Sequence, residues 1–186
     1  MSDARAVVLV EGPSDQAAVE AMAEHRGRKL HAEGIAIMPM GGSKNIRSYL
    51  EQFGPHGLGV KVAGLYDEAE DRDFRRGLER AGLGAQLSRV GMEALGFFVC
   101  VADLEDELIR SLGTERVEEV IEAQGELGSF RTLQQQPAQR GRTIEAQLRR
   151  FIGTRSGRKI AYARLLVDAL ELTRVPRPLD HLLAFI

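Results

Sequence analysis

Short apolar runs alternate with helical patterns in the first part of the chain. Four runs are rich in β-branched or aromatic residues, at 7–10, 35–38, 59–66 and 97–101. Runs of this length are typical of strands that are buried on both faces of a sheet. Because helical patterns separate them, we predict an α/β fold: one parallel sheet of about four strands, with right-handed connections and flanking helices.

The rest of the chain shows helical periodicity only. Helices are predicted at 104–112, 115–124, 143–152, 160–172 and 179–186, in addition to those at 16–25, 43–53 and 74–81 between the strands. Ser43 is placed to cap the second of the inter-strand helices, and Pro176 with Pro178 should end the helix before them. The loop at 134–141 is the best candidate for a mobile boundary. We therefore predict a core at 1–112 and a helical C-terminal extension at 113–186 that packs on it.

The composition is that of a soluble globular protein, with 44% hydrophobic and 28% charged residues. No apolar run approaches the roughly 20 residues that cross a bilayer, and no basic stretch followed by an apolar one opens the chain. We expect a cytoplasmic location without membrane contact. The single cysteine, Cys100, lies in an apolar run and is predicted to be a core residue.

Three common kinds of site are not encoded. The Gly-x-x-x-x-Gly-Lys-Ser/Thr loop is absent, so we expect no ATPase site. The four histidines and Cys100 do not stand at the spacing of a structural zinc site. The Gly-x-Ser-x-Gly turn of many serine hydrolases is also absent.

The net charge of −2 conceals two segments of opposite charge. Residues 101–130 contain nine acids and two bases, and residues 131–164 contain nine bases and one acid. The acidic segment is suited to binding cations, and the basic segment is suited to binding the backbone of a polyanion such as a nucleic acid. The same pattern would also arise if the two segments packed against each other as charge-complementary surfaces.

Carboxylates follow three of the four predicted strands. They are Glu11 and Asp15 after the first strand, Asp67 and Glu70 after the third, and Asp103 and Glu105 after the fourth. The carboxyl ends of parallel strands meet at one edge of a sheet, where open α/β sheets bind ligands. Carboxylates that converge there repel each other, and a divalent cation resolves the repulsion. Because oxygen ligands select magnesium or manganese over zinc, we predict a Mg²⁺ or Mn²⁺ site.

The second predicted strand leads into Gly41-Gly42. These glycines let the backbone approach a ligand, and Lys44 could reach a phosphate. The glycines are equally explained as the components of a tight turn between a strand and a helix. The basic residues Arg149, Arg155 and Arg158 are the other candidates for nucleic-acid binding.

The order of these motifs resembles a TOPRIM domain, the metal-dependent phosphotransfer module of topoisomerases, primases and OLD (overcoming lysogenization defect) nucleases. The resemblance rests on Glu11-Gly12-x-x-Asp15, on the Gly-Gly loop and on the acids from Asp67 onward. It covers roughly the first two thirds of the chain and implies a TOPRIM/Rossmann-like sheet with the catalytic core at 1–112. Ala69 departs from the family pattern Asp-x-Asp, and Glu70 could supply the missing oxygen.

Two further features favour the OLD branch of the family. Asp103-Leu104-Glu105 fits a short acidic element that follows the fourth strand, and Lys159 fits a lysine near the start of a late helix that reaches the active site. The resemblance implies two ions. One would be held by Glu11, Asp67 and Asp15, and the other by Asp103 and Glu105, assisted by Glu70. The implied catalytic residues are Glu11, Asp67, Glu105 and Lys159.

The implied function is a metal-dependent endonuclease or nickase that acts on DNA. Because ATPase motifs are missing, the chain would act alone or with an ATPase encoded elsewhere. The alternatives are an RNA-processing or primase-like TOPRIM protein, a non-catalytic nucleic-acid-binding or regulatory module, and, less favoured, a receiver-like domain phosphorylated on Asp67. For each acidic cluster, a solvated turn or a favourable charge at a helix start is the simpler explanation.

Overall fold

The computed structural model describes residues 4–154 and 156–186, and its centre is one four-stranded sheet. All strand pairs are parallel, and the strand order is β2-β1-β3-β4. The strands are β1 (Ala6–Val10), β2 (Ile35–Pro39), β3 (Lys61–Asp67) and β4 (Phe97–Cys100). The α/β prediction is therefore confirmed. Because β1 and β3 are central, the residues that follow them leave the sheet side by side at its carboxyl edge.

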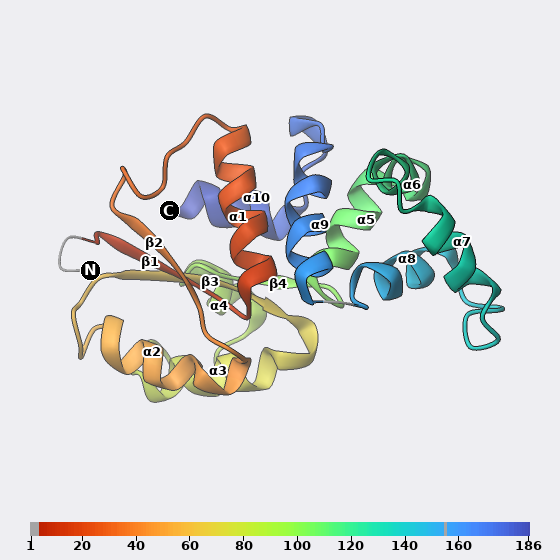
Figure 1. Cartoon of the computed structure of the whole chain (residues 1–186). Helices are drawn as coiled ribbons and strands as arrows, with labels where there is room; N and C mark the ends of the chain where they lie inside the picture. Colours follow the sequence, from red (N-terminus) through yellow and green to blue (C-terminus); the bar gives the residue numbers. More distant parts are fainter. Residues whose placement is uncertain (1–3, 155) are drawn as a thin grey trace.

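Helices cover both faces of the sheet (Figure 1). One face carries α2 (Ile46–Phe53), α3 (Asp71–Arg80) and α4 (Arg89–Ala94). The other face carries α1 (Pro13–His25), α9 (Ser156–Asp168) and α10 (Arg177–Phe185). Alternate residues of β1 point to opposite faces, so Val8 and Val10 pack under α1 while Leu9 packs toward α2 and α3. This two-sided burial explains why the strands read as continuous apolar runs.

The remaining helices extend the molecule beyond the end of β4 (Figure 1). They are α5 (Leu104–Leu112), α6 (Thr114–Ala123), α7 (Leu127–Gln135) and α8 (Ile144–Ile152). The core under α1 continues into these helices through Leu108, Phe130 and Phe151, which are all buried. The C-terminal half thus shares a core with the sheet. The division into units at 1–112 and 113–186 stays a prediction.

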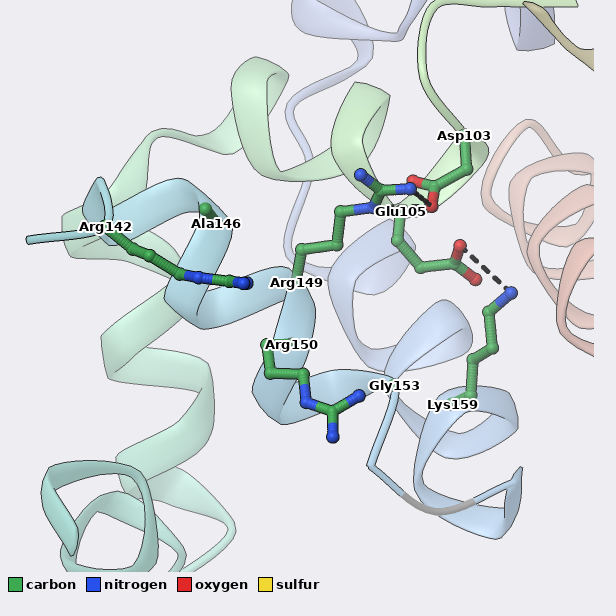
Figure 2. Close-up of a pocket in the computed structure, with 8 residues that line it drawn as sticks. All are labelled: Asp103, Glu105, Arg142, Ala146, Arg149, Arg150, Gly153 and Lys159. Atoms are coloured by element: carbon green, nitrogen blue, oxygen red, sulfur yellow. Dashed lines mark hydrogen bonds and ion pairs between the residues drawn. The ribbon is translucent and has the colours of Figure 1, made fainter. Parts of the chain in front are cut away.

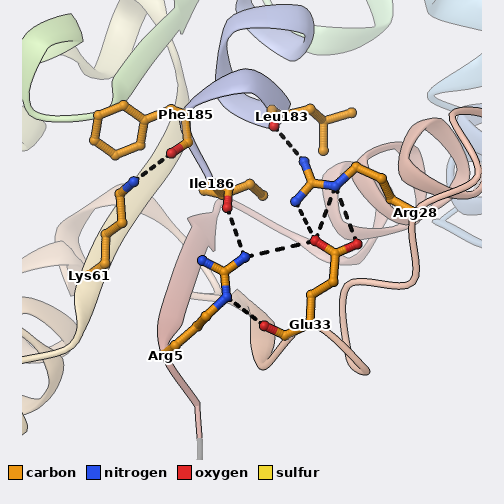
Figure 3. A network of polar contacts seen from close by, with 7 residues as sticks. All are labelled: Arg5, Arg28, Glu33, Lys61, Leu183, Phe185 and Ile186. Atoms are coloured by element: carbon orange, nitrogen blue, oxygen red, sulfur yellow. Dashed lines mark hydrogen bonds and ion pairs between the residues drawn. The ribbon is translucent and has the colours of Figure 1, made fainter.

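Helix α10 is held against the sheet through its last carbonyl groups (Figure 3). Three cations of the N-terminal half donate to them: Arg5 to Ile186 (3.1 Å), Arg28 to Leu183 (2.5 Å) and Lys61 to Phe185 (2.5 Å). The end of a helix leaves carbonyls without partners and carries a partial negative charge, which cations stabilise. These contacts tie the end of the chain to its beginning.

Some local predictions were wrong. Helices α4 and α7 were not predicted, and the helix that was expected to run to Leu172 ends at Asp168. Pro178 lies in the first turn of α10, where proline is tolerated because that turn leaves its N–H groups unpaired. Ser43 does not cap α2. It lies in a short 3-10 helix (Ser43–Asn45) and its hydroxyl donates to Asp73 at 3.4 Å. Cys100 is buried, as predicted. Within residues 4–154 and 156–186, no helix combines the length and hydropathy that a bilayer crossing requires.

Gly96→Ala is expected to loosen the docking of α10. Gly96 adopts φ +91°, and a Cβ there would lie 2.3 Å from a ring carbon of Phe185. Strained backbone and overpacking together should lower the free energy of unfolding by about 2–4 kcal/mol. Gly125→Ala is the matched control, since Gly125 has φ +70° but open space around it. Denaturant unfolding followed by circular dichroism should show the larger loss for Gly96→Ala, and equal losses would contradict the assigned packing of Phe185.

Candidate active site

The carboxylates that follow β1 and β3 meet at the carboxyl edge of the sheet. Glu11 follows β1, and Asp67 ends the neighbouring strand β3. Asp15 stands in the first turn of α1, where its Oδ2 accepts the backbone N–H of Gly12 at 2.9 Å. This contact closes the turn between β1 and α1 and fixes Asp15 beside Glu11.

Asp67 is the most strongly perturbed acid of this group. Burial raises its pKa to about 8, and the negative charges of Asp15, Glu11 and Asp103 add to the shift. The pKa of Asp15 is also raised, by burial first, against the opposing effects of the Gly12 N–H and of Lys159. Acids from three different strand ends thus interact electrostatically in one partly dry site, which is typical of functional sites.

Glu70 lies on the same side, in a 3-10 helix (Glu68–Glu70) directly after β3. Burial and the charge of Glu11 raise its pKa, against the opposing effect of the nearby Ser43 hydroxyl. Its Oε2 is buried and has no hydrogen-bond partner among the described residues. A buried carboxylate oxygen without a partner is costly, so this atom is available to a ligand.

The turn between β4 and α5 positions the remaining two acids. Ala102 adopts φ +66°, a strained conformation for alanine, and Asp103 then caps α5 by accepting the N–H of Asp106 on its Oδ1 at 2.8 Å. Glu107, which the sequence analysis did not single out, steadies the same turn by accepting the N–H of Val101 at 2.8 Å. The strained turn and its two anchors fix the start of α5.

Glu105 is almost fully buried and is paired with Lys159. Its carboxylate is 4% exposed and lies 3.2 Å from the Lys159 Nζ (Figure 2). Burial raises the pKa of Glu105 to about 7, although the charge of Lys159 opposes the shift. Burial lowers the pKa of Lys159, but Glu105 and Asp15 outweigh it, so its pKa is raised. Lys159 therefore stays protonated beside the carboxylates.

Arg149 of α8 reaches across to Asp103. Its Nε and Nη2 lie 2.6 and 2.5 Å from Asp103 Oδ2, and its side chain remains 45% exposed. The two pairs border an open cavity of about 360 Å³ between α5, α8 and α9 (Figure 2). Arg142 and Arg150, which were not predicted as site residues, also line this cavity. Their only signal in the sequence was membership of the basic segment.

The donor set fits a hard divalent cation, although it does not form a closed cage. Six carboxylates from neighbouring strand ends are electrostatically coupled, and Glu70 Oε2 is a buried oxygen without a hydrogen-bond partner among the described residues. In the part of the chain that the structure describes, no three carboxylate, histidine or cysteine groups are arranged to hold a metal as they stand. Glu11, Asp15 and Asp67 would have to draw together around an ion, whereas Asp103 and Glu105 already have cationic partners.

The other predicted binding residues are distributed unevenly. Lys44 is exposed beside the Gly41-Gly42 turn, whose N–H groups both donate to the Glu11 carbonyl. Arg158 does not line the cavity. It pairs with Glu126 at 2.7 Å and lies over the Phe151 ring at 4.2 Å, so it joins α9 to its neighbours. Arg155 falls outside the described residues.

The two oppositely charged segments do pack against each other. Among the residues described in these segments, four bases of 131–164 pair with acids of 101–130: Arg131 with Glu118, Arg149 with Asp103, Arg158 with Glu126, and Lys159 with Glu105. The charge asymmetry therefore has a structural component. Arg142 and Arg150, which line the cavity without an acidic partner among the described residues, are left for binding a polyanion.

Comparisons with known proteins agree with this architecture. Residues 4–68 match the family model "Overcoming lysogenization defect protein-like, TOPRIM domain". The C-terminal region of the Xanthomonas campestris pv. campestris OLD protein is similar, with a TM-score of 0.72 and 26% identity over 97% of this chain and 93% of that one. The C-terminal region of the Burkholderia pseudomallei OLD protein has the same fold, with a TM-score of 0.73 and 22% identity over 98% and 96%. No curated protein matches the chain.

Asp67→Asn is expected to stabilise the protein in the presence of a chelator. Because the folded-state pKa of Asp67 lies near 8, above that of the unfolded chain, wild-type stability should fall as pH rises from about 4 to about 8. The variant removes this loss, and its melting temperature at pH 8 should exceed that of the wild type by several degrees.

The matched control is Asp168→Asn, at the opposite end of α9 from Lys159, where the carboxylate is 54% exposed. Melting curves at pH 5 and pH 8 should show a pH-dependent gain for Asp67→Asn only. A gain of the same size in both variants would mean that the carboxylate cluster does not repel itself in the folded state.

Proposed function

We propose that this chain, whose TOPRIM domain resembles the TOPRIM domain of OLD proteins, is a metal-dependent nuclease that hydrolyses phosphodiester bonds of DNA. The observation that carries the proposal is the meeting of coupled, partly buried carboxylates with the protonated Lys159 at the carboxyl edge of the sheet. Such a site is suited to a phosphodiester, whose hydrolysis adds negative charge that cations must balance.

Two ions of Mg²⁺ or Mn²⁺ are the proposed cofactors. Glu11, Asp15 and Asp67 would hold one, and Asp103 and Glu105, with Glu70 assisting, would hold the other. When bound, such ions lower the pKa of a water and stabilise a leaving oxygen. The partnerless oxygen of Glu70 supports its role as the substitute for the missing acid at Ala69.

Lys159 is proposed to neutralise charge on the substrate phosphate. Its side chain is 40% exposed, so the Nζ can face a substrate while it remains paired with the buried Glu105. A protonated lysine at this place offsets charge on the phosphate. Lys44 and the arginines Arg149, Arg155 and Arg158 are proposed to bind the nucleic acid. Arg158 has the weakest support, because its side chain is 13% exposed and engaged by Glu126.

An ATPase is proposed as a partner, and these 186 residues contain no P-loop of their own. The two solved relatives are described as C-terminal regions of OLD proteins, which is compatible with an ATPase part elsewhere in those proteins. RNA is the alternative substrate, because the phosphate contacts proposed here do not distinguish it from DNA.

The test is cleavage of supercoiled plasmid in Mn²⁺, Mg²⁺ or chelator. Nicking should require the metal and should fall by about 100-fold or more in Glu11→Gln, Glu105→Gln and Lys159→Met, since each removes a ligand or a charge at the reacting centre. Glu122→Gln, on the exposed face of α6, is the control for loss of an acid. A structured RNA in parallel reactions identifies the substrate class.

Cleavage that persists in chelator, or that survives all three substitutions, would refute the proposal. Absence of cleavage of both DNA and RNA, together with calorimetric titrations that show no Mn²⁺ binding, would favour the non-catalytic binding module. That alternative draws support from the existing pairs of Asp103 with Arg149 and of Glu105 with Lys159.

A further inference from the structure

Arg149 occupies the Asp103 oxygen that does not cap α5. Asp103 Oδ1 accepts the N–H of Asp106 and is committed to capping α5. Asp103 Oδ2 accepts the Nε–H of Arg149 at 2.6 Å and forms an ion pair with its Nη2 at 2.5 Å. A divalent cation that binds to Oδ2 therefore competes with the guanidinium, because two cations on one oxygen repel each other.

The pair between Arg149 and Asp103 can be exchanged at low cost. The Arg149 side chain is 45% exposed, although the Asp103 side chain is only 14% exposed, and solvent at the guanidinium screens the pair and limits its contribution to stability. Arg149 also reaches Asp103 from a different element, across the open cavity between α8 and α5 (Figure 2). Rotation of the side chain into the cavity would break neither the cap of α5 nor the helix α8.

The cavity itself attracts an anion. Arg142 and Arg150 line it beside Arg149 and Lys159, and neither forms an ion pair with an acid among the described residues (Figure 2). Asp103 and Glu105 balance only Arg149 and Lys159, which leaves two positive charges uncompensated. The cavity, at about 360 Å³, is within the size range of small-ligand sites. Guanidinium groups bind phosphate oxygens in bidentate geometry, so a phosphate would compete with Asp103 for Arg149.

We propose that Arg149 is an exchangeable counter-ion that couples the binding of a nucleotide phosphate to the binding of a divalent cation at Asp103 and Glu105. With the cavity empty, Arg149 holds Asp103 Oδ2. A phosphate that enters between Arg142 and Arg150 takes over the guanidinium and frees that oxygen for the cation. The inference rests on the proposed function, because it assigns the order in which that site is filled.

Two quantities follow from the exchange. Linkage requires that phosphate and cation tighten each other's binding by the same factor. An exposed ion pair of this kind corresponds to a factor of about 2–5 in an equilibrium constant. Arg149→Gln removes the competing cation, so this variant should bind Mn²⁺ about 2–5-fold more tightly than wild type in the absence of phosphate. Addition of phosphate should no longer increase its affinity for Mn²⁺.

The experiment is calorimetric titration of the full chain with Mn²⁺, alone and with saturating thymidine 3′,5′-bisphosphate. This mononucleotide carries two phosphates but no phosphodiester bond, so it cannot be hydrolysed by the proposed activity. Thymidine without phosphates is the uncharged control, and titration of Mn²⁺ into the bisphosphate alone corrects for direct chelation. Circular dichroism verifies that each variant is folded.

Arg150→Gln is the matched variant. It removes one positive charge from the same cavity without touching Asp103, so it measures the long-range electrostatic effect on Mn²⁺ binding. Arg149→Lys retains the positive charge but loses the planar guanidinium that holds Asp103 Oδ2. Its affinity for Mn²⁺ should lie between those of the wild type and Arg149→Gln. Tighter Mn²⁺ binding in Arg149→Gln than in Arg150→Gln, with coupling to the bisphosphate lost only in Arg149→Gln, supports the exchange.

Equal Mn²⁺ affinities in Arg149→Gln and Arg150→Gln, or coupling that persists in Arg149→Gln, would overturn the exchange. If plasmid nicking is present in the same preparations, that result leaves the proposed nuclease function standing. If the wild type and both Arg149 variants bind no Mn²⁺ and no nicking is seen, the exchange and the nuclease function fail together.

Discussion

Electrostatic repulsion among carboxylates at one edge of a parallel sheet is the constraint on which this structure depends. The sheet places the ends of β1, β3 and β4 together, so Glu11, Asp67 and Asp103 cannot avoid each other. Burial increases the cost, because ions are weakly solvated there. Two features reduce the repulsion. The pKa of Asp67 is raised to about 8, and cations from distant helices pair with Asp103 and Glu105.

The C-terminal helices supply those cations. Helix α9 lies along α1 on the sheet and positions Lys159 against Glu105, while α8 carries Arg149 to Asp103. These contacts require α8 and α9 to be docked, and Arg158 contributes by joining Glu126 to the Phe151 ring. The helical extension is therefore part of the site as well as of the core. A carboxylate edge without it would lack its counter-ions.

The acidic and basic segments illustrate how one pattern can serve two purposes. Packing accounts for the pairs that Arg131 and Arg158 form, and it explains much of the asymmetry without any ligand. Arg142 and Arg150 remain without acidic partners among the residues described, and they face the same cavity as Arg149 and Lys159. Some bases of the segment thus serve to pack it against the acidic segment, and others remain available to bind a polyanion.

The sequence by itself determined the sheet and the acids at its edge, because buried parallel strands are continuous apolar runs and their ends are marked by the residues that follow. The positions of Glu11, Asp67 and Asp103 could be inferred for that reason. The sequence alone did not determine α4 and α7, which are short helices whose burial depends on neighbours far along the chain. Nor could it separate Arg158, which pairs with Glu126, from Arg150, which lines the cavity, since both lie in one basic segment. Only the tertiary structure decided which charges are paired, because pairing depends on distances between elements that are remote in sequence.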